Sequence, residues 1–216
     1  MHRIKQLIKG NEKFKSLYFP YFEEELKLSI QIGQKPEVLF IGCSDSRVTP
    51  DLMLDAKPGD MFILRNVGNF IPPYKADNDF HGSAAAIEYA VSVLGVKDII
   101  VCGHSHCGAC KSLYDEIPIE STLVHVKKWL ELGAKAKEFT LRTIKDPNDK
   151  EDLYRQTERN SILYQVENLF SYPAVKERID QKTLTIHGWY YCIETGLIEY
   201  YDLEKKQYKP LKELLS

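Results

Sequence analysis

Two stretches that contain cysteine and histidine, each directly after an apolar run, hold the residues of this sequence that could do chemistry. The first is Cys43-Ser44-Asp45-Ser46-Arg47, and the second includes His104 and Cys107. If both runs are strands of one parallel sheet, Cys43, His104 and Cys107 can meet, because open α/β sheets place their chemistry beyond the carboxyl ends of the strands. Two thiolates and one imidazole suit zinc. Three protein ligands leave a fourth position for water, as in catalytic zinc sites.

The same residues allow plainer interpretations. Cys107-Gly108-Ala109-Cys110 is a Cys-x-x-Cys sequence, which lowers a thiol pKa at a helix N-terminus and is typical of redox dithiols. Neither a redox dithiol nor a core histidine explains His104 three residues before Cys107, and Cys43 is followed by a possible ion pair, Asp45 with Arg47. Three hypotheses remain at this point: a catalytic zinc site, a non-catalytic zinc site closed by a fourth protein ligand, and a thiol redox protein.

The elements that must position these residues predict an α/β fold. Unbroken apolar runs are typical of strands covered on both faces, and a strand, helix, strand order with short connections makes a sheet parallel. The turn Glu194-Thr195-Gly196 predicts a hairpin into an antiparallel edge strand over 197–201. We therefore expect a mostly parallel central sheet of four strands with an antiparallel edge strand, flanked by helices. The four strands are predicted at 38–41, 61–64, 98–102 and 184–192, and the helices at 83–94, 108–114, 123–132 and 153–170.

An N-terminal helical arm is predicted over 1–35, ahead of a single α/β zinc-enzyme domain over 36–216. Apolar residues recur at helical spacing over 2–18, Pro20 is expected to interrupt the helix, and the pattern resumes over 21–32. The pattern alone leaves open whether this arm packs on another subunit or on its own domain.

Composition narrows the classes of function. A chain of 216 residues fits one domain, and a net charge of −2 argues against a nucleic-acid partner. The sequence shows neither a signal-like N-terminus nor an apolar run long enough for a membrane span, which predicts a cytoplasmic protein without a membrane partner. Five cysteines, three of them crowded between 102 and 110, indicate metal or redox work in a reducing compartment. Cys102 and Cys192 are expected in the core.

The paired motifs resemble the signature of the β-class carbonic anhydrases. The likeness runs from Gln34 through Cys110, including Pro58-Gly59, 65–69 and 86–90, and it returns at His187-Gly188-Trp189. It implies the reversible hydration of carbon dioxide to bicarbonate and a proton by attack of zinc hydroxide. Zn²⁺ would be bound by Cys43, His104 and Cys107. A carbonyl sulfide or carbon disulfide hydrolase on the same fold is the alternative enzyme.

The resemblance also implies roles around the metal. Asp45 would accept the hydrogen bond of the zinc-bound oxygen, and Arg47 would keep Asp45 ionised and away from the metal. His106 has no matching ligand role and is expected to be solvated, with a proton shuttle as the alternative. Cys110 is not expected to be a ligand, and a redox role is its alternative. Because the substrate pocket is shared across a dimer interface in that family, a homodimer, possibly a tetramer, is expected. The pocket residues carried over are Gln34, Phe62, Val67, Tyr89 and Gly108.

One subclass of the β-class is regulated by bicarbonate in a second pocket built from Trp, Arg and Tyr. Arg65 and Tyr191 match two of those positions, whereas Phe40 stands where the Trp would be. A phenyl ring has no N–H to donate. The sequence is therefore predicted to resemble the other, plant-like subclass, in which the site stays open and water remains on zinc.

Overall fold

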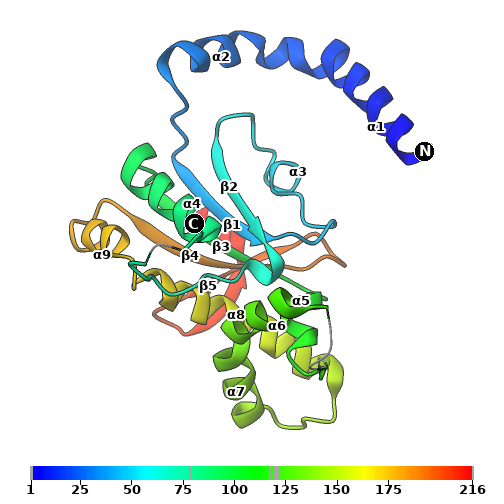
Figure 1. Ribbon diagram of the computed structural model, residues 1–216, viewed down its shortest axis with the longest axis vertical. Coiled ribbons are helices and arrows are strands. Elements are labelled where there is room, and N and C mark those ends of the chain that lie inside the picture. Colours follow the sequence, from blue (N-terminus) through cyan, green and yellow to red (C-terminus); the bar gives the residue numbers. More distant parts are fainter. Residues whose placement is uncertain (1, 78, 117, 119–121, 216) are drawn as a thin grey trace.

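The computed structural model describes residues 2–77, 79–116, 118 and 122–215. In these residues the strands form one six-stranded sheet in the order β2-β1-β3-β4-β5-β6 (Figure 1). Its strands are β1 Val38–Cys43, β2 Met61–Asn66, β3 Asp98–His104, β4 Thr185–Tyr191, β5 Ile198–Asp202 and β6 Gln207–Pro210. The predicted α/β class is confirmed.

The first four strands in spatial order are parallel, so their carboxyl ends share one edge of the sheet. The register pairs Cys43 with Asn66, Gly42 with Cys102, and His104 with Tyr191. β1 and β3 are buried over almost their whole length, which explains their unbroken apolar sequences. This shared edge is what positions the ends of β1 and β3 next to each other.

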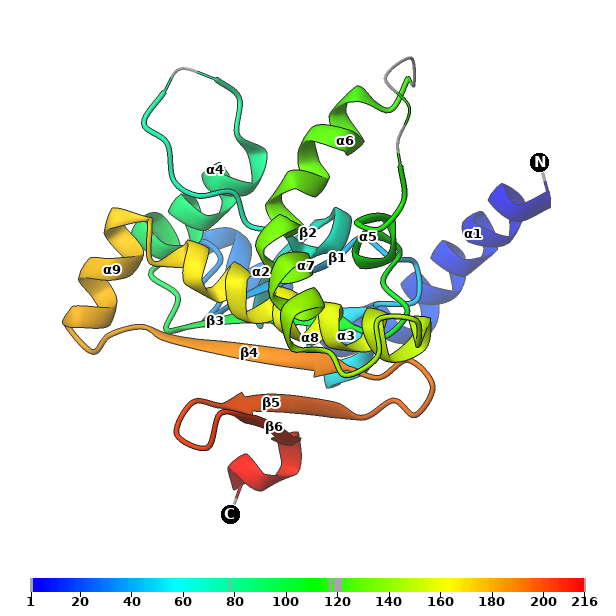
Figure 2. The same cartoon turned by 90° about the horizontal axis from the view of Figure 1, so that it is seen from below.

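The antiparallel part of the sheet is larger than predicted. β5 pairs with β4 as expected, and Gly196 in the connecting turn has a φ of +73°. A further strand, β6, pairs antiparallel with β5, so β6 rather than β5 forms the edge. Figure 2 shows these last strands at one side of the sheet. The sequence of β6, Gln-Tyr-Lys-Pro, is short and mostly polar, which is why its pattern did not predict a strand.

Helices cover one face of the sheet densely. Ile162 of α8 packs with Ile87 and Val91 of the α4 region against Leu39, Ile41, Ile99 and Val101, which are alternate residues of β1 and β3. The other face carries a smaller cluster around Phe40, Ile100 and Cys102. The helices of this part are α3 Pro50–Leu54, α4 Gly82–Glu88, α5 Gly108–Ser112, α6 Val124–Leu130, α7 Ala134–Thr143, α8 Lys150–Leu169 and α9 Pro173–Asp180, with a π-helical segment at Tyr89–Leu94 and 3₁₀ turns at Val67–Asn69, Glu131–Gly133 and Leu211–Leu215.

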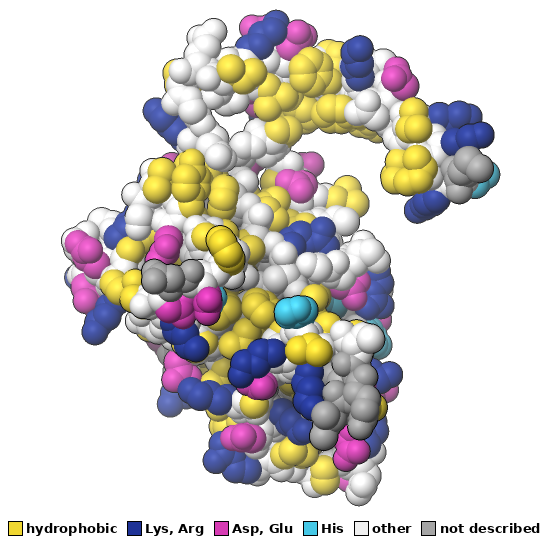
Figure 3. Space-filling view, viewed as in Figure 1, with side chains coloured by type: hydrophobic (Ala, Val, Ile, Leu, Met, Phe, Trp, Pro, Cys, Tyr) yellow, Lys and Arg dark blue, Asp and Glu magenta, His cyan; other side chains and the backbone are white. Residues whose placement is uncertain are grey.

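The N-terminal helices are α1 His2–Lys13 and α2 Phe19–Ile32, joined by a π-helical turn at Phe14–Tyr18. The expected interruption at Pro20 is wrong, because Pro20 lies in the first turn of α2, where a missing N–H costs nothing. None of these described residues is buried. Figure 3 shows apolar side chains along this part of the chain. Ile4 and Leu7 of α1 and Leu28 of α2 are among the exposed apolar residues.

No helix in the described parts of the chain is long and apolar enough to cross a membrane.

Candidate metal centre and active site

Three predicted ligands meet at the carboxyl edge of the parallel strands. Cys43 ends β1, His104 ends β3, and Cys107 is the residue directly before α5. Their ligand atoms all lie within 4.8 Å of one another, and all three side chains are buried. The parallel register therefore brings together residues that the sequence separates widely.

The orientation of His104 fits a metal ligand. Its Nδ1 donates a hydrogen bond to the backbone carbonyl of Ser105 at 2.8 Å, because a carbonyl can only accept. This bond leaves the lone pair on Nε2, which is buried and has no hydrogen-bond partner in the described structure. A buried polar atom without a partner is costly, and metal-binding histidines are typically held by their other ring nitrogen in this way.

The two thiols also fit a cation. The contact with Cys107, together with burial, raises the pKa of Cys43 to about 12, and the contact with Cys110, together with burial, raises the pKa of Cys107 well above its usual value. Both sulfurs would therefore be neutral alone, and a divalent ion is what would favour their thiolate forms. The backbone N–H groups of Asp45 and Gly68 each point at the Cys43 sulfur at 3.4 Å.

Gly68 is required by this arrangement. Its φ is +76°, and a Cβ there would lie 2.7 Å from the Cβ of Ala109. Only glycine both adopts this conformation readily and lets the backbone N–H approach the sulfur of Cys43. The soft sulfur–sulfur–nitrogen donor set, three ligands in number, is that of a zinc site with one position left for water.

Asp45 and Arg47 form a two-pronged ion pair beside the metal ligands. Arg47 Nε donates to Asp45 Oδ1 at 2.9 Å, and Arg47 Nη2 donates to Oδ2 at 2.7 Å. The Arg47 backbone N–H also donates to Oδ1 at 2.9 Å. These bonds from Arg47 hold the pKa of the Asp45 carboxyl well below its usual range. Arg65 secures the loop by donating to the carbonyls of Cys43 at 3.0 Å and Asp45 at 2.7 Å.

Glu158 of α8 is a residue of this site that sequence reasoning missed. Its Oε1 accepts the backbone N–H of Cys107 at 2.9 Å, while Arg155 and Tyr190 donate to Oε2 at 2.8 and 2.9 Å. Burial raises the pKa of Glu158 to about 7, against the opposing effect of Arg155. Its position four residues before Ile162, on the buried face of α8, was the available signal.

His106 is less solvated than expected. Its ring is half-exposed, yet both nitrogens are hydrogen-bonded: Nε2 with Glu194 and Nδ1 with Arg155 Nη2, the latter at 2.9 Å. Arg155 must donate to Nδ1, so the ring donates from Nε2 to the Glu194 carboxylate. Hydrogen-bonding partners on both sides fix the ring in place.

The remaining cysteines are free thiols. Cys110 and Cys102 are buried, as expected for Cys102. Cys192 is only half-buried and donates to Glu194 Oε2 at 3.2 Å, so its expected place in the core is wrong. Its position just beyond β4, where the chain turns toward solvent, accounts for the difference.

The residues predicted for the substrate pocket fall into two groups. Gly108 directly follows the ligand Cys107, and Val67 precedes Gly68, whose N–H points at the Cys43 sulfur. Phe62 and Tyr89 are in ring contact, with centroids 5.9 Å apart, and Phe62 pairs with Leu39, four residues before Cys43. Gln34 is exposed and precedes β1. Within one chain the structure therefore does not bring the second group to the metal ligands.

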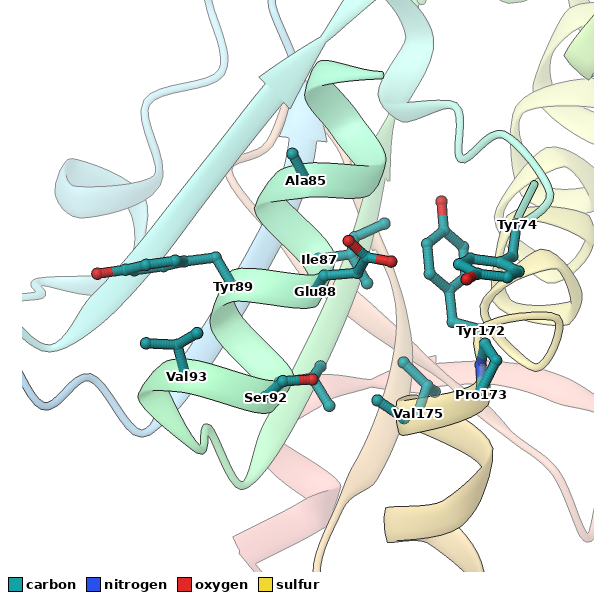
Figure 4. A pocket seen from close by; sticks show the side chains of 12 residues that line it. Tyr74, Ala85, Ile87, Glu88, Tyr89, Ser92, Val93, Tyr172, Pro173 and Val175 are labelled. Atoms are coloured by element: carbon teal, nitrogen blue, oxygen red, sulfur yellow. The ribbon is translucent and has the colours of Figure 1, made fainter. Parts of the chain in front are cut away.

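A groove of about 450 Å³ lies between the α4 region and α9, away from the metal ligands. Figure 4 shows Tyr74 and Tyr172 on one side of this groove, whereas Tyr89 points to the opposite side of its helix. Beside the metal ligands lies a smaller cavity of about 290 Å³, whose lining includes Arg47, His106 and Cys107. Of the three metal ligands, only Cys107 lines this smaller cavity.

An α/β sheet with a buried Cys–His–Cys set and an adjacent carboxylate–guanidinium pair defines a zinc enzyme that activates water. Comparison with known proteins specifies which one. The family profile described as carbonic anhydrase matches residues 38–198. A carbonic anhydrase of Synechocystis is 43% identical over 202 residues, covering 92% of this chain and 71% of that protein.

Solved structures agree. The β-carbonic anhydrase CcaA superposes with a TM-score of 0.87 and 38% identity, covering 96% of this chain and 99% of that chain. One of two tetrameric β-carbonic anhydrases from Sordaria macrospora superposes with a TM-score of 0.80 and 26% identity, covering 93% and 97%. The chain belongs to the carbonic anhydrase family, in its β-class. It catalyses the hydration of carbon dioxide with zinc held by Cys43, His104 and Cys107.

Proposed function

We propose that Asp45 and Arg47 are the catalytic pair of this carbonic anhydrase. Bound zinc supplies Lewis-acid chemistry, lowering the pKa of a water ligand toward about 7. Two thiolates cancel the charge of the ion and weaken this effect, so a neighbouring base matters more. The Asp45 carboxylate, ionised and two residues from Cys43, is placed to accept a hydrogen bond at its free lone pairs.

Arg47 has a separate task in this proposal. A free carboxylate so near the metal ligands could itself become a ligand and occupy the position needed by water. The two-pronged bond from Arg47 keeps both Asp45 oxygens turned toward the guanidinium. Arg47 thus maintains both the charge and the direction of the base. The observation that carries the proposal is this bidentate geometry beside Cys43.

The carbon dioxide pocket is proposed to be completed by a second copy of this chain. Gln34, Phe62 and Tyr89 lie toward the amino ends of the strands, and Val67 and Gly108 lie at the metal edge. A homodimer, possibly a tetramer, would bring the two groups together and cover the arm over 1–35, which has no buried residue among those described. The rest of the chain, 36–216, would form the zinc-enzyme domain.

We also propose the open-site, plant-like subclass. Phe40 is fully buried in an apolar cluster that Tyr191 joins, and Arg65 is engaged by backbone carbonyls. A bicarbonate ion bound beside Phe40 would find no Trp N–H to donate to its oxygen, and that oxygen would face hydrocarbon.

The five free thiols support a reducing, cytoplasmic location.

The catalytic pair is tested by Asp45→Asn and Arg47→Ala, measured by stopped-flow carbon dioxide hydration together with zinc content. Asp45→Asn should keep zinc and lose roughly 10-fold or more in kcat, since a neutral amide replaces the charged hydrogen-bond acceptor and breaks the ion pair with Arg47. Arg47→Ala should lower kcat at least as far, because it frees the carboxylate. Parental turnover in either variant would show that the pair is structural.

A further inference from the structure

The Ser105-His106 turn between the metal ligands has an uncommon backbone conformation. His106 has a φ of +57°, in the left-handed region that non-glycine residues seldom adopt. Such a conformation persists where the surrounding contacts over-determine it. The turn therefore needs partners that hold it, and these partners lie far away in the sequence.

Glu194, in the turn between β4 and β5, is the principal partner. Its Oε2 accepts from Ser105 Oγ at 2.5 Å, and its Oε1 accepts from His106 Nε2. The neighbouring Ile193 N–H donates to Ser105 Oγ at 2.8 Å. One carboxylate thus binds both side chains of the turn, and Arg155 holds the His106 ring from its other nitrogen.

The backbone of the same turn contacts the catalytic pair. The His106 carbonyl accepts from Arg47 Nη2 at 3.1 Å, and that nitrogen also donates to Asp45 Oδ2 at 2.7 Å. We propose that Glu194 is a positioning residue for catalysis: it fixes the Ser105-His106 turn, whose carbonyl holds Arg47 against Asp45. This inference rests on the proposed catalytic role of Asp45 and Arg47.

The turn held by Glu194 matters for catalysis because the Arg47 side chain is otherwise free to move. The Arg47 side chain is 49% exposed, so its orientation depends on the few acceptors that hold it. Without Glu194, the turn loses two side-chain anchors, and the His106 peptide can leave its left-handed conformation. The carbonyl then leaves Nη2, and Asp45 is correctly oriented for less of the time. In the described structure the side-chain hydrogen bonds of Glu194 reach Ser105, His106 and Cys192, none of them a proposed pocket residue.

The test compares Glu194→Ala with Glu204→Ala, an exposed glutamate in the turn between β5 and β6. Glu194→Ala should lower kcat by roughly 3- to 10-fold with an unchanged KM and zinc content, because the lost bonds orient Arg47 and do not touch the metal ligands. Glu204→Ala should match the parent. Glu194→Gln, which keeps an acceptor for one of the two donors, should recover part of the loss. A parental kcat in Glu194→Ala would overturn the proposal.

A second measurement tests the route through Arg47. In the Arg47→Ala background, adding Glu194→Ala should cause no further loss of kcat, since the group it orients is gone. An equal loss in both backgrounds would show that Glu194 acts elsewhere and would overturn the positioning role. If Arg47→Ala lowers kcat but Glu194→Ala keeps the parental kcat, only the positioning role of Glu194 is refuted. If Arg47→Ala itself keeps the parental kcat, the proposed catalytic pair is refuted.

Discussion

The metal edge of the sheet and the N-terminal arm differ in how far one chain completes them. At the metal edge the ligands are buried, and the surrounding loops are tied by Arg47, Arg65 and Glu158. The arm over 1–35 carries apolar side chains at helical spacing, yet none of its described residues is buried. Both regions follow from apolar patterning, but only the metal edge is buried within one chain, and the arm is proposed to pack on a second copy.

This difference separates metal binding from substrate binding. The three zinc ligands come from the ends of β1 and β3 and from the residue before α5, all within one chain, so each chain should bind its own ion. The proposed pocket combines residues from both ends of the strands. Removing a zinc ligand should therefore affect the chain that carries it, whereas removing a pocket residue should affect the site of the partner chain.

The largest effect is expected from removing a ligand. Cys43→Ala or Cys107→Ala should lose zinc and activity together, because two remaining ligands bind the ion too weakly and water cannot replace a thiolate. Zinc content by atomic absorption and the carbon dioxide hydration rate measure this. Cys110→Ser is the matched control, a buried neighbour outside the Cys43, His104 and Cys107 cluster, and it should keep zinc and most activity. Zinc loss in Cys110→Ser, or an active, zinc-replete Cys107→Ala, would contradict the ligand assignment.

An intermediate effect is expected from mixing chains. Gln34→Ala should keep zinc but lose activity, and Cys107→Ala should lose zinc. Unfolding and refolding the two variants together should restore about one quarter of parental activity, because half of the dimers are mixed and each has one complete site. Activity no higher than the sum of the separate variants would place Gln34 at its own chain's metal or outside the pocket.

Sequence reasoning reached the residues whose signal is local. Cys43 and His104 end unbroken apolar runs, so the parallel sheet and its chemical edge could be predicted before any coordinates. Glu158 and Glu194 could not be assigned to the site, although the spacing from Ile162 places Glu158 on the buried face of α8, because their partners are 51 and 88 or 89 residues away. A buried carboxylate in α8 and an acidic residue in a hairpin turn look ordinary until the fold brings Cys107 and Ser105 to them.

The same limit applies to the outer elements. β6 is too short and polar to show a strand pattern, and α7 and α9 were not predicted. The helical spacing predicted helices over 2–18 and 83–94, but it did not predict their π-helical segments at Phe14–Tyr18 and Tyr89–Leu94. The arm's proposed contact surface stays a prediction, since it involves a second copy.

The smallest effect concerns regulation. Phe40 is 0% exposed, and in the proposed subclass it replaces the Trp of the bicarbonate pocket, so a bicarbonate oxygen there would lose a hydrogen bond worth about 1–3 kcal/mol. Occupancy of such a site at equal bicarbonate concentration falls roughly tenfold or more. We therefore expect a hyperbolic dependence of the rate on bicarbonate.

The pH profile tests the same point at Asp45. Arg47 depresses the pKa of Asp45 in the folded protein, so the stabilising pair is fully present above the unfolded pKa near 3.9 and is lost only as pH falls through the lower folded pKa. Between pH 8 and 6 Asp45 stays ionised and paired with Arg47. The pH dependence of kcat/KM should therefore follow one titrating group, without the steeper loss below neutrality that binding of Asp45 to the metal would cause. Cobalt substitution followed by absorption spectroscopy near pH 6 reports the fourth ligand. An Asp45 oxygen on the metal there would show that Phe40 does not prevent closure, and the open-site assignment would fail while the zinc enzyme remained.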